Sequence, residues 1–314
     1  MQVSQLFTLG KDQSTLEFVD VEVTTDVPLF LMPSALLKMS DREWADNCVV
    51  LIKDFFQEVI NRIKAEDYQK AESLLKRLEN EPNETHLGLS TRHSRGRSSN
   101  STDSRNINER LVHGGAVERG LISELEDTAL FIEGIAADKI SDMTTDIIRE
   151  KLIEFTQSMC DKYEIPMREE VDCGLIWDIG SHTWKPLVTK LPYAEEEPLI
   201  LVPKELVRRA LVYSYRSLYY RTILSYFQDQ EMEFQQSLVE VLHDQEVKKP
   251  TKKDLSKRYP GKKGDVYRYA SENPSFIDEY REIMEDRIPG PLSNERLKKL
   301  IKKSIKTKDE SQPD

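Results

Sequence analysis

Apolar residues recur every three or four positions along much of this chain, and this period limits its fold more than any other feature. The clearest stripe consists of Trp44, Cys48, Leu51, Phe55, Val59 and Ile63. Such spacing places the side chains on one face of a helix. Asp41 precedes the stripe and is a typical N-cap residue. The sequence therefore predicts a long amphipathic helix that begins near residue 41.

Further helices are predicted from the same period. A second helix runs from Tyr68 to Leu78, and Ile148 to Met159 forms another stripe. The longest pattern, Leu206 to Leu242, predicts one long helix or two nearly continuous ones. Tyrosines cluster within it, and at helical spacing we expect them to pack in the core rather than to stack on bases. Three shorter helices are expected around Asp254, Phe276 and Leu297.

Strand patterns are confined to two regions. The first thirty or so residues alternate loosely and predict one or two short strands, and residues 173–202 predict a small antiparallel sheet. The expected fold class is therefore α+β, predominantly helical, in one large domain. We place this main domain at residues 1–246 and a basic helical C-terminal region at residues 247–314.

Composition and missing motifs exclude several classes of protein. The three cysteines lack the spacing of a zinc or redox site, which favours a reducing, cytoplasmic compartment. We expect neither secretion nor membrane spanning, because the sequence shows no signal peptide and no apolar run of about 18 residues. P-loop, GxGxxG, GxSxG and HExxH motifs are absent, and the five histidines are scattered.

Charge is distributed unevenly along a chain whose formal net charge is −11. Residues 248–268 hold nine Lys or Arg against two Asp, and the Ser-rich residues 88–108 contain four arginines. Such basic patches neutralise phosphates, so nucleic acid is the expected partner. For residues 88–108 a solvated linker is the simpler interpretation. The predicted contact residues are Arg92, Arg95, Arg97, Lys252, Lys253, Lys257, Arg258, Lys262 and Lys263.

A second basic segment, residues 296–308, holds seven basic side chains and no acidic one. Leu297, Leu300, Ile301 and Ile305 lie on one face of the expected helix, so the segment is both amphipathic and basic. Three interpretations remain open for it. The helix pairs with the acidic remainder of the protein or with another subunit, binds nucleic acid, or lies on anionic lipid.

Carboxylates between residues 124 and 146 offer a possible catalytic site. Asp138, Asp142 and Asp146 follow at steps of four, and Glu124 or Glu133 completes an oxygen ligand set of the kind that Mg²⁺ or Mn²⁺ prefers. The competing interpretation is structural. Ser141 or Thr144 caps a helix that starts near Ile147, and the aspartates favour its positive end.

The segment EGIAADKISDMTTDIIREKLIEFTQ, with WDIG and ILVPKELVRR downstream, resembles uncharacterised bacterial proteins found among mobile-element and phage-defence genes. The resemblance implies a setting of defence against foreign nucleic acid and transfers no catalytic residue. The leading functional hypothesis is a defence component that contacts nucleic acid. The alternatives are a metal-dependent nuclease or hydrolase centred on Asp138 and Asp142, and a non-enzymatic scaffold subunit of a protein complex.

Overall fold

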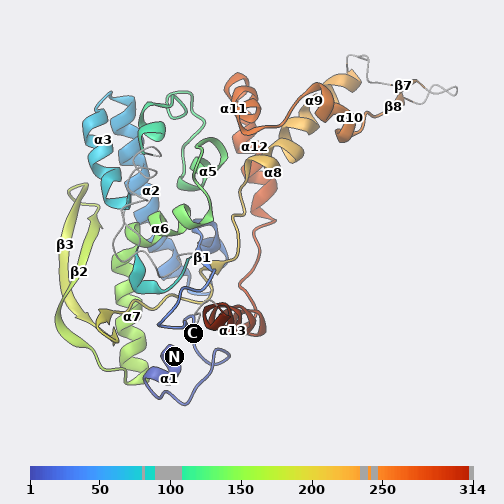
Figure 1. The fold of residues 1–314 in the computed structure, drawn as a ribbon. Helices are drawn as coiled ribbons and strands as arrows, with labels where there is room; N and C mark the ends of the chain where they lie inside the picture. Colours follow the sequence, from blue (N-terminus) through green and yellow to red (C-terminus); the bar gives the residue numbers. More distant parts are fainter. Residues whose placement is uncertain (80–81, 89–107, 234–239, 242–246, 311–314) are drawn as a thin grey trace.

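The computed structural model describes residues 1–79, 82–88, 108–233, 240–241 and 247–310. Figure 1 shows a body that contains the N-terminal helices, an arm of helices α8 to α12 that extends from it, and a final helix, α13, that returns beside the N-terminus. We use "body" for the described part of residues 1–214 and "arm" for that of residues 215–285.

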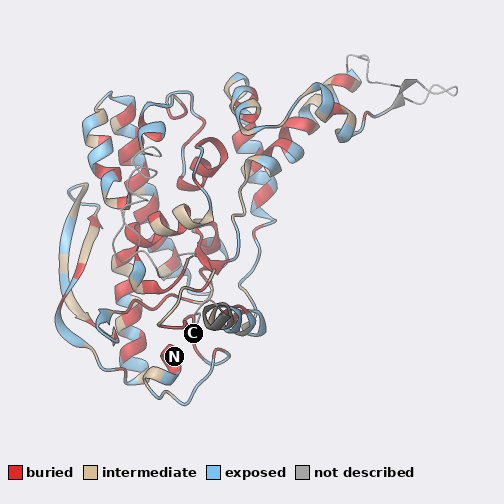
Figure 2. Cartoon of the chain, viewed as in Figure 1, coloured by how far each residue is buried: buried red, intermediate tan, exposed pale blue. Residues whose placement is uncertain are grey.

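The body contains helices α1 (Val3–Leu6), α2 (Arg42–Lys64), α3 (Tyr68–Leu75), α5 (Thr128–Phe131), α6 (Ala137–Ile147) and α7 (Arg149–Tyr163), and residues 108–113 are also helical. Helix α2 confirms the first prediction, because the Asp41 carboxylate accepts a hydrogen bond from the Trp44 amide at 3.1 Å. Its stripe is buried from Cys48 to Ile63, whereas Trp44 is partly buried. Figure 2 shows buried residues gathered where α2, α6 and α7 meet.

A long hairpin runs along one side of the body. Strands β2 (Arg168–Asp178) and β3 (Thr183–Leu191) pair antiparallel, with Trp177 opposite Trp184. The Trp177 ring lies edge-on to Phe55 of α2 at 4.9 Å between centroids, and its indole nitrogen donates to Asp54 at 2.7 Å. These contacts attach the hairpin to α2 and confirm the predicted antiparallel pairing.

The remaining strands are two-residue pairs. β1 (Phe30–Leu31) pairs with β6 (Val207–Arg208), β4 (Tyr193–Ala194) with β5 (Glu197–Pro198), and β7 (Glu240–Val241) with β8 (Val247–Lys248). Before β1, the pairing of the first thirty residues is limited to isolated bridges. Residues 199–202, expected as a strand, are extended and buried without belonging to a sheet. The chain is nevertheless predominantly helical α+β, as predicted.

The predicted helix from Leu206 to Leu242 is wrong near its end, where Glu240 and Val241 form strand β7, and residues 234–239 and 242 lie outside the described residues. It is also wrong over its first nine residues. Val207 and Arg208 pair with β1 instead, and Leu206 and Val207 are completely buried in the body. Helix begins only at α8 (Tyr215–Leu218), which continues through the π-helical segment η5 (Tyr219–Ile223) into α9 (Leu224–Glu233). Ser214 caps this run, since its hydroxyl accepts from the Ser217 amide at 3.2 Å.

The later helices are α10 (Lys252–Arg258), α11 (Lys263–Glu272), α12 (Ser275–Glu285) and α13 (Asn294–Glu310). Among the described residues, no helix is long and apolar enough to span a membrane. All three cysteines are free and buried.

Candidate nucleic-acid interface

Aromatic side chains form the interior of the arm. The Phe227 ring of α9 stacks on Tyr259 at 4.0 Å and meets Tyr269 of α11 edge-on at 5.2 Å. Tyr219 is also buried, which confirms packing for this tyrosine, whereas Tyr220 remains 51% exposed. The arm therefore has a small core of its own, in which π-stacking and edge contacts supplement apolar burial.

The turn between α10 and α11 depends on a glycine. A Cβ atom at Gly261 would overlap the ring of Tyr219, so the backbone approaches that ring as only glycine permits. The Tyr219 hydroxyl in turn donates to the carbonyl of Tyr259. These contacts fix the direction in which the chain leaves α10 and enters α11.

The four cations of helix α10 differ in their contacts, and the side chain of Arg258 is 42% exposed although it reaches a buried acid. Lys252 donates to the Ser225 hydroxyl at 2.8 Å, and Arg258 lies 3.1 Å from the completely buried Glu231. Lys253 and Lys257 are exposed. Burial lowers the pKa of Lys252. Half of the predicted contact residues of this helix therefore serve the fold of the arm.

The same division occurs at α11. Lys262, the residue before the helix, is exposed, whereas Lys263 is half-buried and donates to the carbonyl of Ile132 in the body at 2.6 Å. Burial lowers the pKa of Lys263. Arg268, which was not among the predicted contact residues, has a side chain that is 58% exposed, and its nearest acid is Asp265 at 3.6 Å.

Four exposed cations at α10 and α11, namely Lys253, Lys257, Lys262 and Arg268, are here called the arm cations. Lys257 pairs with Asp254 at 3.0 Å, but such surface pairs are weak and screened by salt. Lys253 and Lys262 show no ion pair with another described residue. The exposure of Arg268 could have been inferred, because Val266, Tyr269 and Ala270 occupy the buried face of the same helix.

The two basic helices contact different neighbours. Helix α10 packs on α9, whereas α11 packs on α5, α8 and α12. In a helix-turn-helix domain, the second helix enters the major groove and reads base edges. Here one side of α11 is turned to the body, where the Tyr267 hydroxyl donates to the carbonyl of Gly114 at 3.2 Å. This arrangement suits contact with phosphates better than insertion into a groove.

The predicted carboxylate site is not assembled in the described part of the chain, where no three His, Cys, Asp or Glu side chains are grouped to hold a metal ion. Asp138 and Asp142 are half-buried on α6, and Asp142 lies 3.7 Å from Lys139. Glu133 is exposed. Glu124 starts the short 3-10 helix Leu125–Asp127, where its amide donates to the Asp127 carboxylate.

Asp146 has a structural role. It is completely buried, and its carboxylate contacts Arg149 at 2.9 Å and Arg77 at 3.3 Å. Arg149 also reaches Glu84 at 3.0 Å. A buried carboxylate needs such partners, because an unpaired charge in the interior is costly.

The capping interpretation of this region is wrong. Helix α6 already begins at Ala137, so Ser141 and Thr144 lie inside it. The Ser141 hydroxyl accepts from the Leu31 amide at 2.9 Å, and Thr144 donates back to the carbonyl of Ile140 at 2.6 Å. Arg92, Arg95 and Arg97 lie outside the described residues.

Comparison with known proteins places the chain in one family. A family model described as a domain of unknown function (DUF8370) matches residues 8–214, and the chain belongs to this family. No curated protein and no solved structure matches the chain. The matched residues end one position before α8, so the arm cations lie outside the matched region. The domain boundary expected near residue 246 stays a prediction.

Proposed function

We propose that this protein binds nucleic acid through the arm cations, by contacts to backbone phosphates. The observation that carries the proposal is the exposure of Lys253, Lys257, Lys262 and Arg268 at two neighbouring helices, whereas Lys252 and Lys263 donate to acceptors within the protein. Lysines and arginines at such a surface displace counterions from the nucleic acid when they bind its phosphates. Binding of this kind depends on salt concentration and shows little preference for base sequence.

The uneven distribution of charge supports this site over the rest of the surface. The whole chain is acidic, and a uniformly acidic surface repels phosphates. A nucleic acid is therefore directed to the basic segments. The proposed setting is bacterial defence against foreign nucleic acid, which rests on the sequence resemblance alone. For metal-dependent cleavage by Asp138 and Asp142, no described geometry adds support.

The test compares two triple charge reversals in a mobility-shift titration of labelled DNA and RNA. Lys253→Glu, Lys257→Glu and Lys262→Glu should weaken binding roughly 10- to 100-fold at low salt and flatten its salt dependence. The matched control, Lys38→Glu, Lys53→Glu and Lys64→Glu, changes the net charge equally at exposed positions of the body. It should bind nearly as the wild type does. No binding by the wild type, or equal losses in both variants, would contradict the proposal.

A further inference from the structure

Helix α13 is held on the protein by its apolar face. Leu297, Leu300 and Ile301 are 0%, 6% and 1% exposed, respectively. At the edge of this face, the Lys298 ammonium lies 2.9 Å from the Asp12 carboxylate. Of the three interpretations left open for this basic segment, pairing with the protein's own acidic residues is therefore observed for Lys298.

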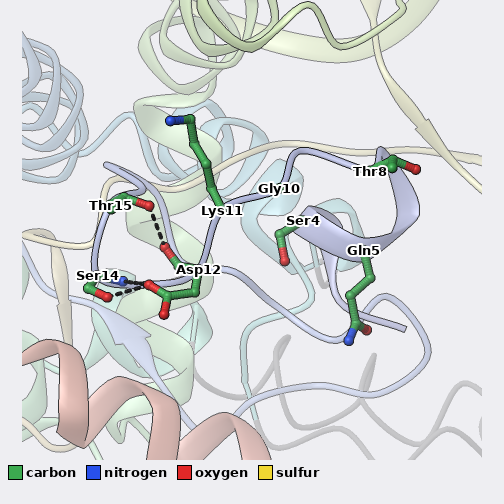
Figure 3. Close-up of a pocket in the computed structure, with 8 residues that line it drawn as sticks. All are labelled: Ser4, Gln5, Thr8, Gly10, Lys11, Asp12, Ser14 and Thr15. Atoms are coloured by element: carbon green, nitrogen blue, oxygen red, sulfur yellow. Dashed lines mark hydrogen bonds between the residues drawn. The ribbon is translucent and has the colours of Figure 1, made fainter.

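The loop that Lys298 of α13 contacts is polar and lies near the N-terminus. Ser14 donates its amide and hydroxyl to the Asp12 carboxylate, and these bonds, together with Lys298, hold the pKa of Asp12 well below its usual value. The loop borders an open depression of about 810 Å³ (Figure 3). The depression is lined by Ser4, Gln5, Thr8, Gly10, Lys11, Asp12, Ser14 and Thr15.

The opposite side of α13 carries a row of cations. Arg296, Lys299, Lys302 and Lys303 are exposed, and we call them the α13 cations. Arg296, Lys299 and Lys303 are spaced by three and four residues and so share one face, over about 10 Å of helix axis. Figure 1 shows helix α13 near the N-terminus, at the other end of the view from α10.

Anionic lipid does not fit this face. A basic amphipathic helix binds a membrane by burying its apolar side among the acyl chains, with electrostatic attraction as an addition. In α13 the apolar side is already occupied by the protein, because Leu297 and Ile301 are buried. Membrane insertion would require the helix to leave its site and break the Lys298–Asp12 pair.

Single-stranded nucleic acid fits less well than a duplex. Proteins that bind single strands stack the bases on aromatic side chains, and residues 294–310 contain no aromatic residue. A straight row of cations on a fixed helix instead matches the regular phosphates of a double helix.

We propose that the α13 cations bind the phosphate backbone of duplex DNA. They form a second contact in addition to that of the arm cations. The inference rests on the proposed nucleic-acid binding and specifies its substrate as a duplex. It also removes the need for the C-terminal helix to move on binding.

The experiment is a fluorescence-anisotropy titration of labelled duplex DNA between low and physiological salt. The variant Arg296→Glu, Lys299→Glu, Lys302→Glu should bind at least about 10-fold more weakly, and the slope of log affinity against log salt should shrink by about 0.9 for each phosphate that the variant no longer neutralises. The glutamine version of the same triple variant should show the smaller decrease in affinity. Unchanged circular dichroism and thermal midpoint would confirm that α13 remains folded.

The outcomes separate this inference from the proposed function. If the arm variant loses affinity and the α13 variant binds as the wild type does, the second contact is refuted and the proposed function stands. If the wild type binds neither duplex nor single-stranded nucleic acid, both fail. Stronger binding to single strands than to duplex would also overturn the inference.

A cross-link tests whether α13 stays in place. Asp12→Cys and Lys298→Cys replace side chains that meet at the surface, and a short bis-maleimide joins them while the native cysteines remain buried. The linked protein should keep its affinity for duplex DNA. Loss of that affinity on linking, or binding of the unlinked protein to phosphatidylserine vesicles that linking abolishes, would show that α13 acts after undocking.

Discussion

In the body, Arg149 meets Asp146 and Glu84 in the interior, whereas in the arm Lys253, Lys257 and Lys262 lie at the surface. Each region also holds the other kind of charge, because Lys38 is exposed in the body and Glu231 is completely buried in the arm. The difference shows that charge density alone does not locate a binding site. Burial and partners decide which charges are available.

The largest expected effect tests whether the ions of the body are structural. Arg149→Met leaves Asp146 buried with Arg77 as its one remaining guanidinium partner among the described residues, so the free energy of unfolding should fall by about 3–5 kcal/mol. Urea denaturation measures this change. As a control, Arg42→Met removes an exposed pair with Asp46 and should cost at most about 1 kcal/mol. Equal losses of unfolding free energy in Arg149→Met and Arg42→Met would contradict the proposed difference between interior and surface ion pairs.

A smaller effect is expected from the turn of the arm. Gly261→Ala places a methyl group on the Tyr219 ring, and such overpacking typically costs about 1–3 kcal/mol. The destabilisation should appear as faster amide hydrogen exchange in α10 and α11, with α2 unchanged. Gly264→Ala is the matched control, because no atom lies within 4 Å of its added Cβ. Equal acceleration in α2 would mean that the arm and the body unfold as one unit.

The effect that is smallest per unit of the variable changed concerns pH at a body carboxylate. Burial raises the pKa of Glu126 to about 8, although Ser34 donates its amide and hydroxyl to it. The folded state thus holds a proton that the unfolded chain releases near pH 4.3, so this contribution to stability is complete below that pH and is lost as pH rises through 8. The free energy of unfolding of the wild type should therefore decrease as pH rises over this range. In Glu126→Gln this decrease should be less steep, by less than about 1.4 kcal/mol per pH unit.

Denaturation of wild type and Glu126→Gln at pH 5, 7 and 9 measures this slope. Glu205→Gln is the control, because Glu205 accepts the same pair of bonds from Ser40 at an exposed site. Its slope should match that of the wild type. A slope for Glu126→Gln equal to that of the wild type would show that Glu126 is ionised in the folded protein.

The sequence predicted those elements whose signals are local. Helix α2 followed from its apolar stripe and the Asp41 cap, and the hairpin followed from its strand residues. The start of the arm was missed because Leu206, Ala210 and Tyr213 continue a helical spacing, while Val207 and Arg208 pair with β1, more than 170 residues earlier. Tertiary pairing there overrides the local pattern.

For the site residues too, the sequence predicted local features but not tertiary contacts. Spacing placed Asp138, Asp142 and Asp146 on one helix face, but it did not show that this face brings Asp146 to Arg77, 69 residues away in sequence. The basic segment was recognised from composition, whereas the inward turn of Lys252 and Lys263 depends on the acceptors Ser225 and Ile132. Such acceptors are identifiable only once the fold is known.

The packing of Trp177 and Trp184 around Phe55 has an optical consequence. All three tryptophans of the chain lie within residues 44–184, while the aromatic rings of the arm are tyrosines and phenylalanines. Emission excited selectively from tryptophan therefore reports the body alone. Tyrosine absorbance includes the arm, so the two signals together follow the two regions in one unlabelled sample.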